Sequence, residues 1–414
     1  MRLTAVEEGH LRNGMPGTIG IAAVFPGEPF DLAQVRSRVR DRWGGLDRMS
    51  LVLGRPGGPA ALSGHRWRTA RPFDPGVHVS ATDQDLRSLL TDGVSDLLPP
   101  ERPLWRLLVT RQGIVLLAHH ALLDGRSLET LFRLLMDDAV TPRAGVAAGA
   151  DPAAVVRQRS RVGAATVYRE LRRIGLPGQP LPAVPDLRPS VAVVELDPQV
   201  MRAARRQPAG GRGATLNELL LSAYAGALHA CYGPLRTWPK APTPLYATVP
   251  VDLRTRQNAG QLGNGVTALR MPLPVDVESP VARLQACQDE VAGFDRRCDA
   301  HRAFLPALKG AARTVPWLAG VMAERLARPE LTTSLCTAFK WRDNPSRLHG
   351  RPLARIVPLP QLSPPGTANL CLVHTADAYT LTVVSHLRAG DAEMIGDAVA
   401  QELKAVAASA AWVS

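Results

Sequence analysis

The sequence lacks the features that mark several whole classes of protein. None of its five cysteines stands in a C-x-x-C pair, which argues against a disulfide framework and against a zinc site. No apolar run approaches the ~20 residues that cross a bilayer. Residues 1–8 contain no apolar secretory core, so we expect a cytoplasmic protein. We expect its cysteines to be small buried apolar groups.

Aromatic residues make up only 5% of the chain, which leaves little capacity for stacking on bases, and no nucleic-acid motif is present. There is no G-x-S-x-G elbow for a serine hydrolase and no phosphate-binding G-x-x-x-x-G-K-S/T loop. The net charge of +12 could instead favour a phosphorylated cofactor, an acidic carrier protein or an anionic lipid surface. General enrichment in arginine explains the charge equally well.

The apolar patterning alternates between strand-like and helix-like segments along the whole chain, which predicts an α/β fold with two related halves. We expect an N-terminal domain over residues 1–150, a crossover over 151–190 and a C-terminal domain over 191–414. The crossover is rich in Pro, Ala and Gly, and arginines cluster between residues 157 and 173. A solvated helix is the favoured interpretation of that cluster, and peripheral contact with a lipid surface or a carrier protein is the alternative.

The most informative segment is His-His-Ala-Leu-Leu-Asp-Gly at residues 119–125. An apolar strand-like run precedes it and a helix-like stretch follows, so a strand ends there in a short loop that presents an imidazole. Histidine is the side chain best suited to moving protons near neutral pH. Because neighbouring side chains of an extended segment face opposite sides, we expect the two rings to point differently, which makes them a poor metal pair.

This H-H-x-x-x-D-G pattern resembles that of the acyltransferase superfamily that includes chloramphenicol acetyltransferase, condensation domains and wax ester synthase/diacylglycerol acyltransferases. The last group is the one that the chain resembles along most of its length. The supporting segments are Leu3–Glu7, Phe73–Val79, Arg102–Trp105, Asn217–Glu218, Val249–Arg254, Leu262–Val266 and Leu362–Gly366. The resemblance implies a chloramphenicol acetyltransferase-like two-domain sandwich.

Two departures from the family pattern bear on the substrate. Glu218 stands where Asp is usual, which we expect to alter a hydrogen bond at a helix start. The family's S-N-V-P-G segment is replaced by residues 334–341, in a region that lines the tunnel between the halves in the family. The altered segment favours the synthesis of a specialised metabolite over that of a storage lipid.

The resemblance also implies residue roles. His120 would be the general base that takes the proton of the acceptor, and His119 would be structural or orienting. The backbone N–H of Gly125 would stabilise the oxyanion. Asp124 would pair with an arginine, for which Arg254 is the candidate; the alternative for Asp124 is a helix N-cap, and that for Arg254 is a surface position.

Trp105 and Asn217 are expected to be structural, through packing and at a helix start respectively. The family needs no cofactor, because an acyl-CoA or a phosphopantetheine thioester is itself the substrate. The leading hypothesis is therefore transfer of an acyl group from acyl-CoA or an acyl-carrier protein to a small-molecule alcohol or amine. The alternatives are amide formation on a carrier protein, as in condensation domains, and a non-catalytic scaffold.

Overall fold

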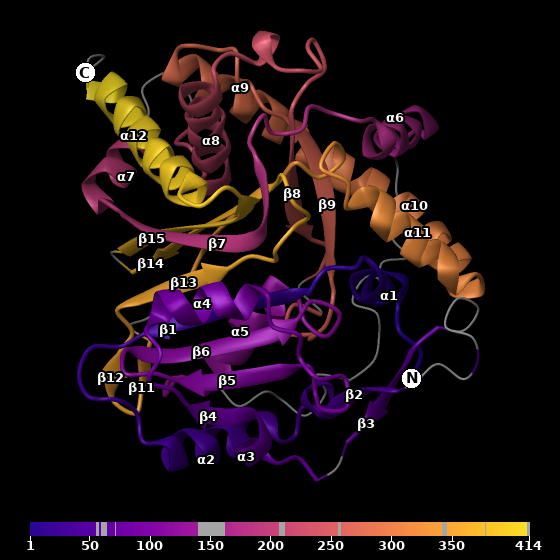
Figure 1. Cartoon of the computed structure of the whole chain (residues 1–414), viewed down its shortest axis with the longest axis vertical. Coiled ribbons are helices and arrows are strands. Elements are labelled where there is room, and N and C mark those ends of the chain that lie inside the picture. The colour runs from indigo at the N-terminus through magenta and orange to yellow at the C-terminus, as the bar shows by residue number, and fades with distance from the viewer. Residues whose placement is uncertain are drawn as a thin grey trace.

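The computed structural model describes residues 1–54, 58, 64–70, 72–139, 162–206, 212–255, 258–341, 346–376 and 378–411. The chain forms two mixed β-sheets with helices packed around them (Figure 1). This confirms the expected α/β architecture. The proposed domain limits stay a prediction, and the boundary at residues 150 and 151 lies outside the described residues.

The first sheet is built mainly from the N-terminal half of the chain. Its strand order is β13-β1-β6-β5-β4. The bounds are β1 Thr18–Val24, β4 Val79–Ala81, β5 Trp105–Val109, β6 Gly113–His119 and β13 Arg355–Leu359. Strands β5 and β6 pair antiparallel and form a hairpin that ends at the histidines. Every residue of β6 is buried, so this strand is a rigid base for the loop that follows it.

The second sheet has the order β7-β15-β14-β10-β8-β9. Its strands are β7 Pro185–Leu196, β8 Tyr246–Asp252, β9 Val266–Pro272, β10 Ser334–Lys340, β14 Ala368–Thr375 and β15 Ala378–Leu387. Strands β14 and β15 pair antiparallel. Strand β10 runs parallel to both neighbours, but its pairing with β8 is confined to Ser334 and Leu335, whereas its pairing with β14 continues to Lys340. The sheet therefore parts between β8 and β10 beyond that point.

Most helices begin at a side-chain cap. Asp31, Asp85, Asp124, Asp197, Thr215 and Ser279 each accept a backbone N–H of the first turn, which satisfies a donor that has no partner inside the helix. The longer helices are α1 Ala5–Arg12, α2 Leu32–Trp43, α4 Leu86–Val94, α5 Gly125–Leu135, α6 Ala164–Gly175, α7 Pro198–Arg205, α8 Leu216–Tyr232, α9 Pro280–Ala292, α10 Phe294–Thr314, α11 Pro316–Leu326 and α12 Asp391–Ala411. No helix in the described part of the chain is both long and apolar enough to cross a bilayer.

The two sheets are joined by a strand exchange and by shared packing. Strand β13 comes from the C-terminal half but pairs with β1 in the first sheet. One apolar cluster contains Val115 and Leu117 of β6 together with Val191 of β7 and Val384 of β15. Helix α4 contacts both β1 and β7. The halves are therefore held by main-chain hydrogen bonds as well as by side chains.

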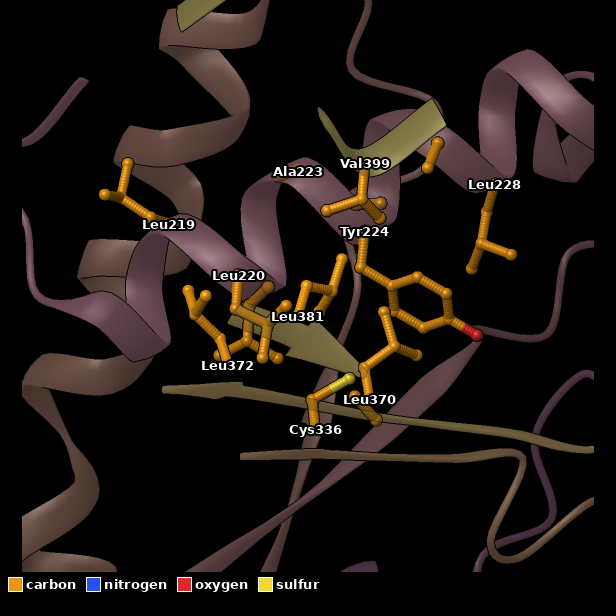
Figure 2. Close-up of a cluster of buried hydrophobic side chains, with 14 of the residues drawn as sticks. Leu219, Leu220, Ala223, Tyr224, Leu228, Cys336, Leu370, Leu372, Leu381 and Val399 are labelled. Atoms are coloured by element: carbon orange, nitrogen blue, oxygen red, sulfur yellow. The ribbon is translucent and has the colours of Figure 1, made fainter. Parts of the chain in front are cut away.

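The core of the second half lies between its sheet and helices α8 and α12 (Figure 2). Leu220 and Tyr224 of α8 point toward the sheet, where Leu372 of β14 lies beside Leu220. The Tyr224 hydroxyl lies 2.5 Å from Ser334 Oγ, so its polar end is satisfied. Helix α8 is apolar on nearly all sides because it is covered by both the sheet and α12.

We expect Leu372→Ala to lower the free energy of unfolding by about 2–5 kcal/mol, because it opens a cavity in this core. Urea unfolding followed by circular dichroism measures the loss. The matched control is Leu187→Ala on β7, whose side chain is 82% exposed and should change stability by less than about 0.5 kcal/mol. Equal losses in the two variants would contradict the packing described.

Candidate active site

The two histidines lie where β6 ends against β1. The His120 backbone N–H donates to Gly17 O at 2.7 Å, which extends the β1–β6 pairing by one residue. The loop then continues to Asp124, and α5 begins at Gly125. A fully buried strand and a capped helix thus fix both ends of the loop that carries the imidazole.

Asn264 sets the tautomer of His120. The Asn264 amide nitrogen donates to His120 O at 2.8 Å and to Ala121 O at 3.2 Å. Its oxygen is therefore the atom that lies 3.1 Å from His120 Nδ1. Because an amide oxygen only accepts, Nδ1 carries the proton and Nε2 keeps its lone pair. A neutral imidazole in this tautomer can take a proton through Nε2.

The His120 ring is enclosed by other imidazoles. His10 of α1 stacks on it with a centroid separation of 4.1 Å and an interplanar angle of 7°. Burial lowers the pKa of His120 below its ordinary value, although Asp124 and Asn264 act in the opposite direction. Burial and the two neighbouring imidazoles hold the pKa of His10 well below its ordinary value. Both rings are therefore uncharged at neutral pH.

His119 has different neighbours from His120. Its Nδ1 accepts the Ala121 N–H at 3.0 Å, which closes the turn after the strand. Burial and the adjacent His120 lower the pKa of His119 to about 4. Gly17, at φ +71°, leaves room for this ring, since a Cβ there would lie 2.6 Å from His119 Nε2. The geometry suits the structural or orienting role expected for His119.

Asp124 is both a helix cap and one half of a buried ion pair, so the two alternatives for it coexist. Its Oδ1 accepts the Ser127 N–H at 2.8 Å. Its Oδ2 lies 2.8 Å from Arg254 Nη2 and accepts the Gly265 N–H at 2.9 Å. The side chains of Asp124 and Arg254 are only 1% and 2% exposed. The carboxylate is therefore fully occupied within the protein.

Arg254 is the centre of the contact between residues 120–124, the candidate catalytic loop, and the segment before β9. It donates to Gly263 O at 2.8 Å and to Ser127 Oγ at 3.2 Å, and Ser127 Oγ also lies within hydrogen-bond distance of both backbone groups of Gly263. Gly265 has to be glycine here, because a Cβ would lie 2.8 Å from the guanidinium carbon of Arg254. The alternative that Arg254 lies at the surface is wrong, because its side chain is only 2% exposed.

Gly125 is the first residue of α5 and is exposed. A Cβ on this residue would meet no atom within 4 Å, so the space beside its main chain is open. The first N–H groups of a helix have no acceptor inside it, and they lie at its positive end. A developing negative charge beside Gly125 would therefore find a favourable environment.

The two remaining predicted residues, Trp105 and Asn217, both make hydrogen bonds within the fold. Trp105 is buried, donates its indole N–H to Met49 O at 2.9 Å and stacks on His78 with centroids 4.5 Å apart. Asn217 is one residue inside α8, and its Oδ1 accepts the Ala338 N–H of β10 at 2.8 Å. It therefore joins a helix start to a strand, a contact that the sequence did not indicate.

The two departures from the family pattern have clear places in the fold. Glu218 completes a capping box with Thr215 and pairs with Arg212. Residues 334–340 form β10, in which Cys336 packs in the core of the second half and Phe339 packs against that of the first. The altered segment is thus an ordered central strand that contacts both halves.

A basic cavity lies where β10 ends beside the start of α8. Its volume is about 550 Å³, and Arg202, Arg205, Arg206 and Lys340 line it together with Phe339. Among the described residues, no acidic side chain lines it. Within the described residues, no group of three or more His, Cys, Asp or Glu side chains is placed to hold a metal ion.

Three important residues were not recognised from the sequence. Asn264 lies in the segment Leu262–Val266, which resembles the family but to which the sequence analysis assigned no role. His10 is an isolated histidine with no motif around it. Arg48 donates to Leu122 O at 2.9 Å and pairs with buried Glu7, which ties α1 to the catalytic loop. Nothing in the local pattern of Arg48 indicates this contact.

We expect Asp124→Asn to destabilise the protein by about 3–5 kcal/mol, because it keeps a capping oxygen but leaves the buried Arg254 charge without its partner. Thermal and urea unfolding measure the loss. Asp252→Asn is the matched control, since Asp252 also contacts Arg254, at 3.1 Å, but is 31% exposed. If Asp124→Asn unfolded no more readily than Asp252→Asn, the buried pair would not hold the loop.

Comparison with known proteins shows what this arrangement resembles. The model of the wax ester synthase/diacylglycerol acyltransferase catalytic domain matches residues 27–218. The wax ester synthase/diacylglycerol acyltransferase from Marinobacter aquaeolei VT8 superposes with a TM-score of 0.63 at 16% identity, over 99% of this chain and 100% of that one.

Condensation domains superpose equally well. The domain from the Monacolin K polyketide synthase MokA gives a TM-score of 0.66 at 16% identity, over 99% of this chain and 98% of that one. The first condensation domain of the calcium-dependent antibiotic synthetase, in complex with a substrate analogue, gives 0.67 at 18% identity, over 98% and 97%. These matches establish the chloramphenicol acetyltransferase-like two-domain fold. Residues 27–218 are thus similar to the wax ester synthase/diacylglycerol acyltransferase catalytic domain, and the whole chain shares its fold with such an enzyme and with condensation domains.

Proposed function

We propose that this protein transfers an acyl group from a pantetheine thioester, either acyl-CoA or an acyl-carrier protein, to a hydroxyl or amine acceptor, with His120 as general base. The observation that carries the proposal is the pairing of His120 Nδ1 with Asn264 Oδ1, which leaves Nε2 unprotonated. The lowered pKa of His120 supports it, because the ring is then in its basic form at neutral pH.

The reaction needs one proton carrier. As the acceptor oxygen or nitrogen attacks the thioester carbonyl carbon, its proton passes to His120 Nε2. The tetrahedral intermediate then collapses, the C–S bond breaks, and the thiolate takes the same proton back. A positioned base of this kind contributes about 10²–10⁴-fold to the rate.

Two further features support the proposal. The open space beside the Gly125 main chain lies at the positive end of α5, where the carbonyl oxygen could develop its negative charge near the Gly125 N–H. Asp124 is engaged by Arg254, Ser127 and Gly265, so its role is to hold the loop and not to exchange protons.

The basic cavity suits the donor. A pantetheine thioester carries phosphate groups whether it is bound to CoA or to a carrier protein, and a cavity with four cationic side chains and no acidic one attracts them. Its Phe339 packs against the same core as Ala121 and Leu122, the residues that follow His120. We infer that the donor phosphate binds in this cavity.

The similar proteins suggest the class of acceptor and the type of bond formed. Similarity extends both to a wax ester synthase/diacylglycerol acyltransferase and to condensation domains of polyketide and peptide synthetases. We propose ester formation in specialised-metabolite or lipid biosynthesis, with amide formation on a carrier protein as the alternative. A cytoplasmic location fits a soluble thioester donor.

We expect His120→Asn to lower acceptor-dependent thiol release from octanoyl-CoA at least about 100-fold, because it removes the base. A panel of long-chain alcohols and amines supplies the acceptor, a thiol reagent follows release, and mass spectrometry distinguishes ester from amide. In the wild type, kcat/KM should fall as the pH drops through the His120 pKa, which lies below 6.5.

His374→Asn is the matched control, since that ring stacks on Tyr379 in β15 and lies outside the catalytic loop. It should retain activity. Unchanged thiol release in a folded His120→Asn protein would refute the general-base role. A wild type that is inactive with every pair of donor and acceptor would favour the scaffold alternative.

We expect the double variant Arg202→Ala/Arg206→Ala to raise the KM for octanoyl-CoA about tenfold with little change in kcat, because it removes two charge-assisted contacts with phosphate. Octanoyl-N-acetylcysteamine has no phosphate, so its KM should not change. Octanoyl-phosphopantetheine carries only the phosphate that CoA and the carrier-protein arm have in common. A rise in its KM like that for octanoyl-CoA would show that the cavity recognises this phosphate. Arg40→Ala, an exposed arginine on α2, is the control. An equal effect on all three donors would contradict a phosphate site.

A further inference from the structure

The His120 side chain has two torsions to restrain, and the contacts described so far restrain only part of its motion. The final torsion of a histidine has a broad energy profile, so the backbone does not set the plane of the ring. Asn264 holds the Nδ1 edge with one hydrogen bond of 3.1 Å. A single bond at one edge still allows the ring to rock about that contact and move Nε2.

His10 supplies the missing restraint. Its ring lies parallel to that of His120, within 7°, at a centroid separation of 4.1 Å. Because the stack restrains the face while Asn264 restrains an edge, the plane and the in-plane direction of the ring are both defined. We propose that His10 is a positioning residue that aims His120 Nε2 and keeps water from the covered face of the ring, a role that rests on the general-base function of His120.

The helix that carries His10 is anchored to the same loop as His120. Glu7 is buried and pairs with Arg48, which donates to Leu122 O at 2.9 Å, two residues beyond His120. Glu7 also accepts the Thr4 N–H at 2.8 Å, and so closes the cap of α1. The ring of His10 is therefore held in register with the loop by a buried ion pair and not by the stack alone.

The other side of α1 is fixed as well. Glu8 binds Arg12 at 2.5 Å and His65 Nδ1 at 2.8 Å. Gly9 faces Ala323 of α11, since a Cβ on Gly9 would lie 3.5 Å from the Ala323 Cβ. Figure 1 shows α1 beside α11, and Leu11 of α1 packs against the core of the first half. This packing on two sides makes α1 a rigid support for His10.

The stack also depends on charge. Among the described residues, the titratable groups that act electrostatically on His10 are His120 and His119, and Asp124 acts on His120. A proton on either stacked ring would place a positive charge in a buried site among other imidazoles. Covering the face of His120 therefore favours its neutral form, which is the form required of a base.

The test compares His10→Ala with His10→Phe. Alanine removes the ring, whereas phenylalanine keeps a flat ring that can stack but cannot carry a proton. We expect His10→Ala to lower kcat about 10–100-fold with KM unchanged, because Nε2 is no longer aimed. His10→Phe should restore most of the loss.

A second readout does not depend on activity. Nitrogen-15 NMR of the imidazole rings, with His120 assigned by the signal lost in His120→Asn, reports its tautomer and pKa. We expect the wild type to hold the Nδ1–H tautomer, and His10→Ala to mix the tautomers and raise the His120 pKa by about one unit as water reaches the ring. This measurement remains decisive even if acyl transfer proves independent of His120.

His65→Ala is the matched control, because it loosens α1 at Glu8 without touching the stack. It should leave the tautomer and pKa of His120 as in the wild type. Thermal unfolding checks that each variant is folded. If His10→Ala is not folded, the test relies on His10→Phe. Three results would each overturn the proposal: wild-type tautomer and pKa in His10→Ala, equal impairment in His10→Phe and His10→Ala, or the same NMR changes in His65→Ala.

Discussion

The site depends on one buried ion pair, between Asp124 of the catalytic loop and Arg254 of the segment that follows β8. Burying two charges is costly, and the cost is met only where every remaining polar atom finds a partner. Ser127, Gly263 and Gly265 supply those partners through a hydroxyl group and main-chain groups. The same contacts bring Asn264, the next residue along, to the edge of His120. The buried pair thus helps to place the residue that sets the tautomer of His120.

His120 is held by three parts of the chain that are far apart in sequence. The end of β6 supplies the residue, the segment before β9 fixes its tautomer through Asn264, and α1 covers its face through His10. Together these contacts orient the ring, and its burial, against the opposing effect of the Asn264 hydrogen bond, lowers its pKa and favours the uncharged form. Catalytic groups gain from such preorganisation because the reacting atom then needs little rearrangement.

The α/β architecture, the β5–β6 hairpin and the loop with its histidines could all be predicted, because local periodicity and one specific motif carry that information. The partners Asn264 and His10 could not be assigned roles in the same way. Their contacts join residues from separate elements, and only the folded chain brings those elements together. Asn217 illustrates the same limit: its helix-start position was visible, whereas its bond to Ala338 depends on where β10 lies. Strand β10 itself was missed as a strand, since its sequence departs from the pattern that would have identified it.

The position of β13 has a consequence for how the protein is made. Strand β1 pairs with β6 on one side, but the strand that pairs with its other side, residues 355–359, is synthesised long after it. Until then the edge of β1 presents unpaired main-chain groups, which are a template for association with other chains. The first sheet therefore completes its hydrogen bonding only after residues 355–359 have been synthesised, and a product truncated before them would leave the edge of β1 exposed. Contacts of such long sequence separation also slow folding. We therefore expect chaperones to shield the newly made chain until residues 355–359 pair with β1.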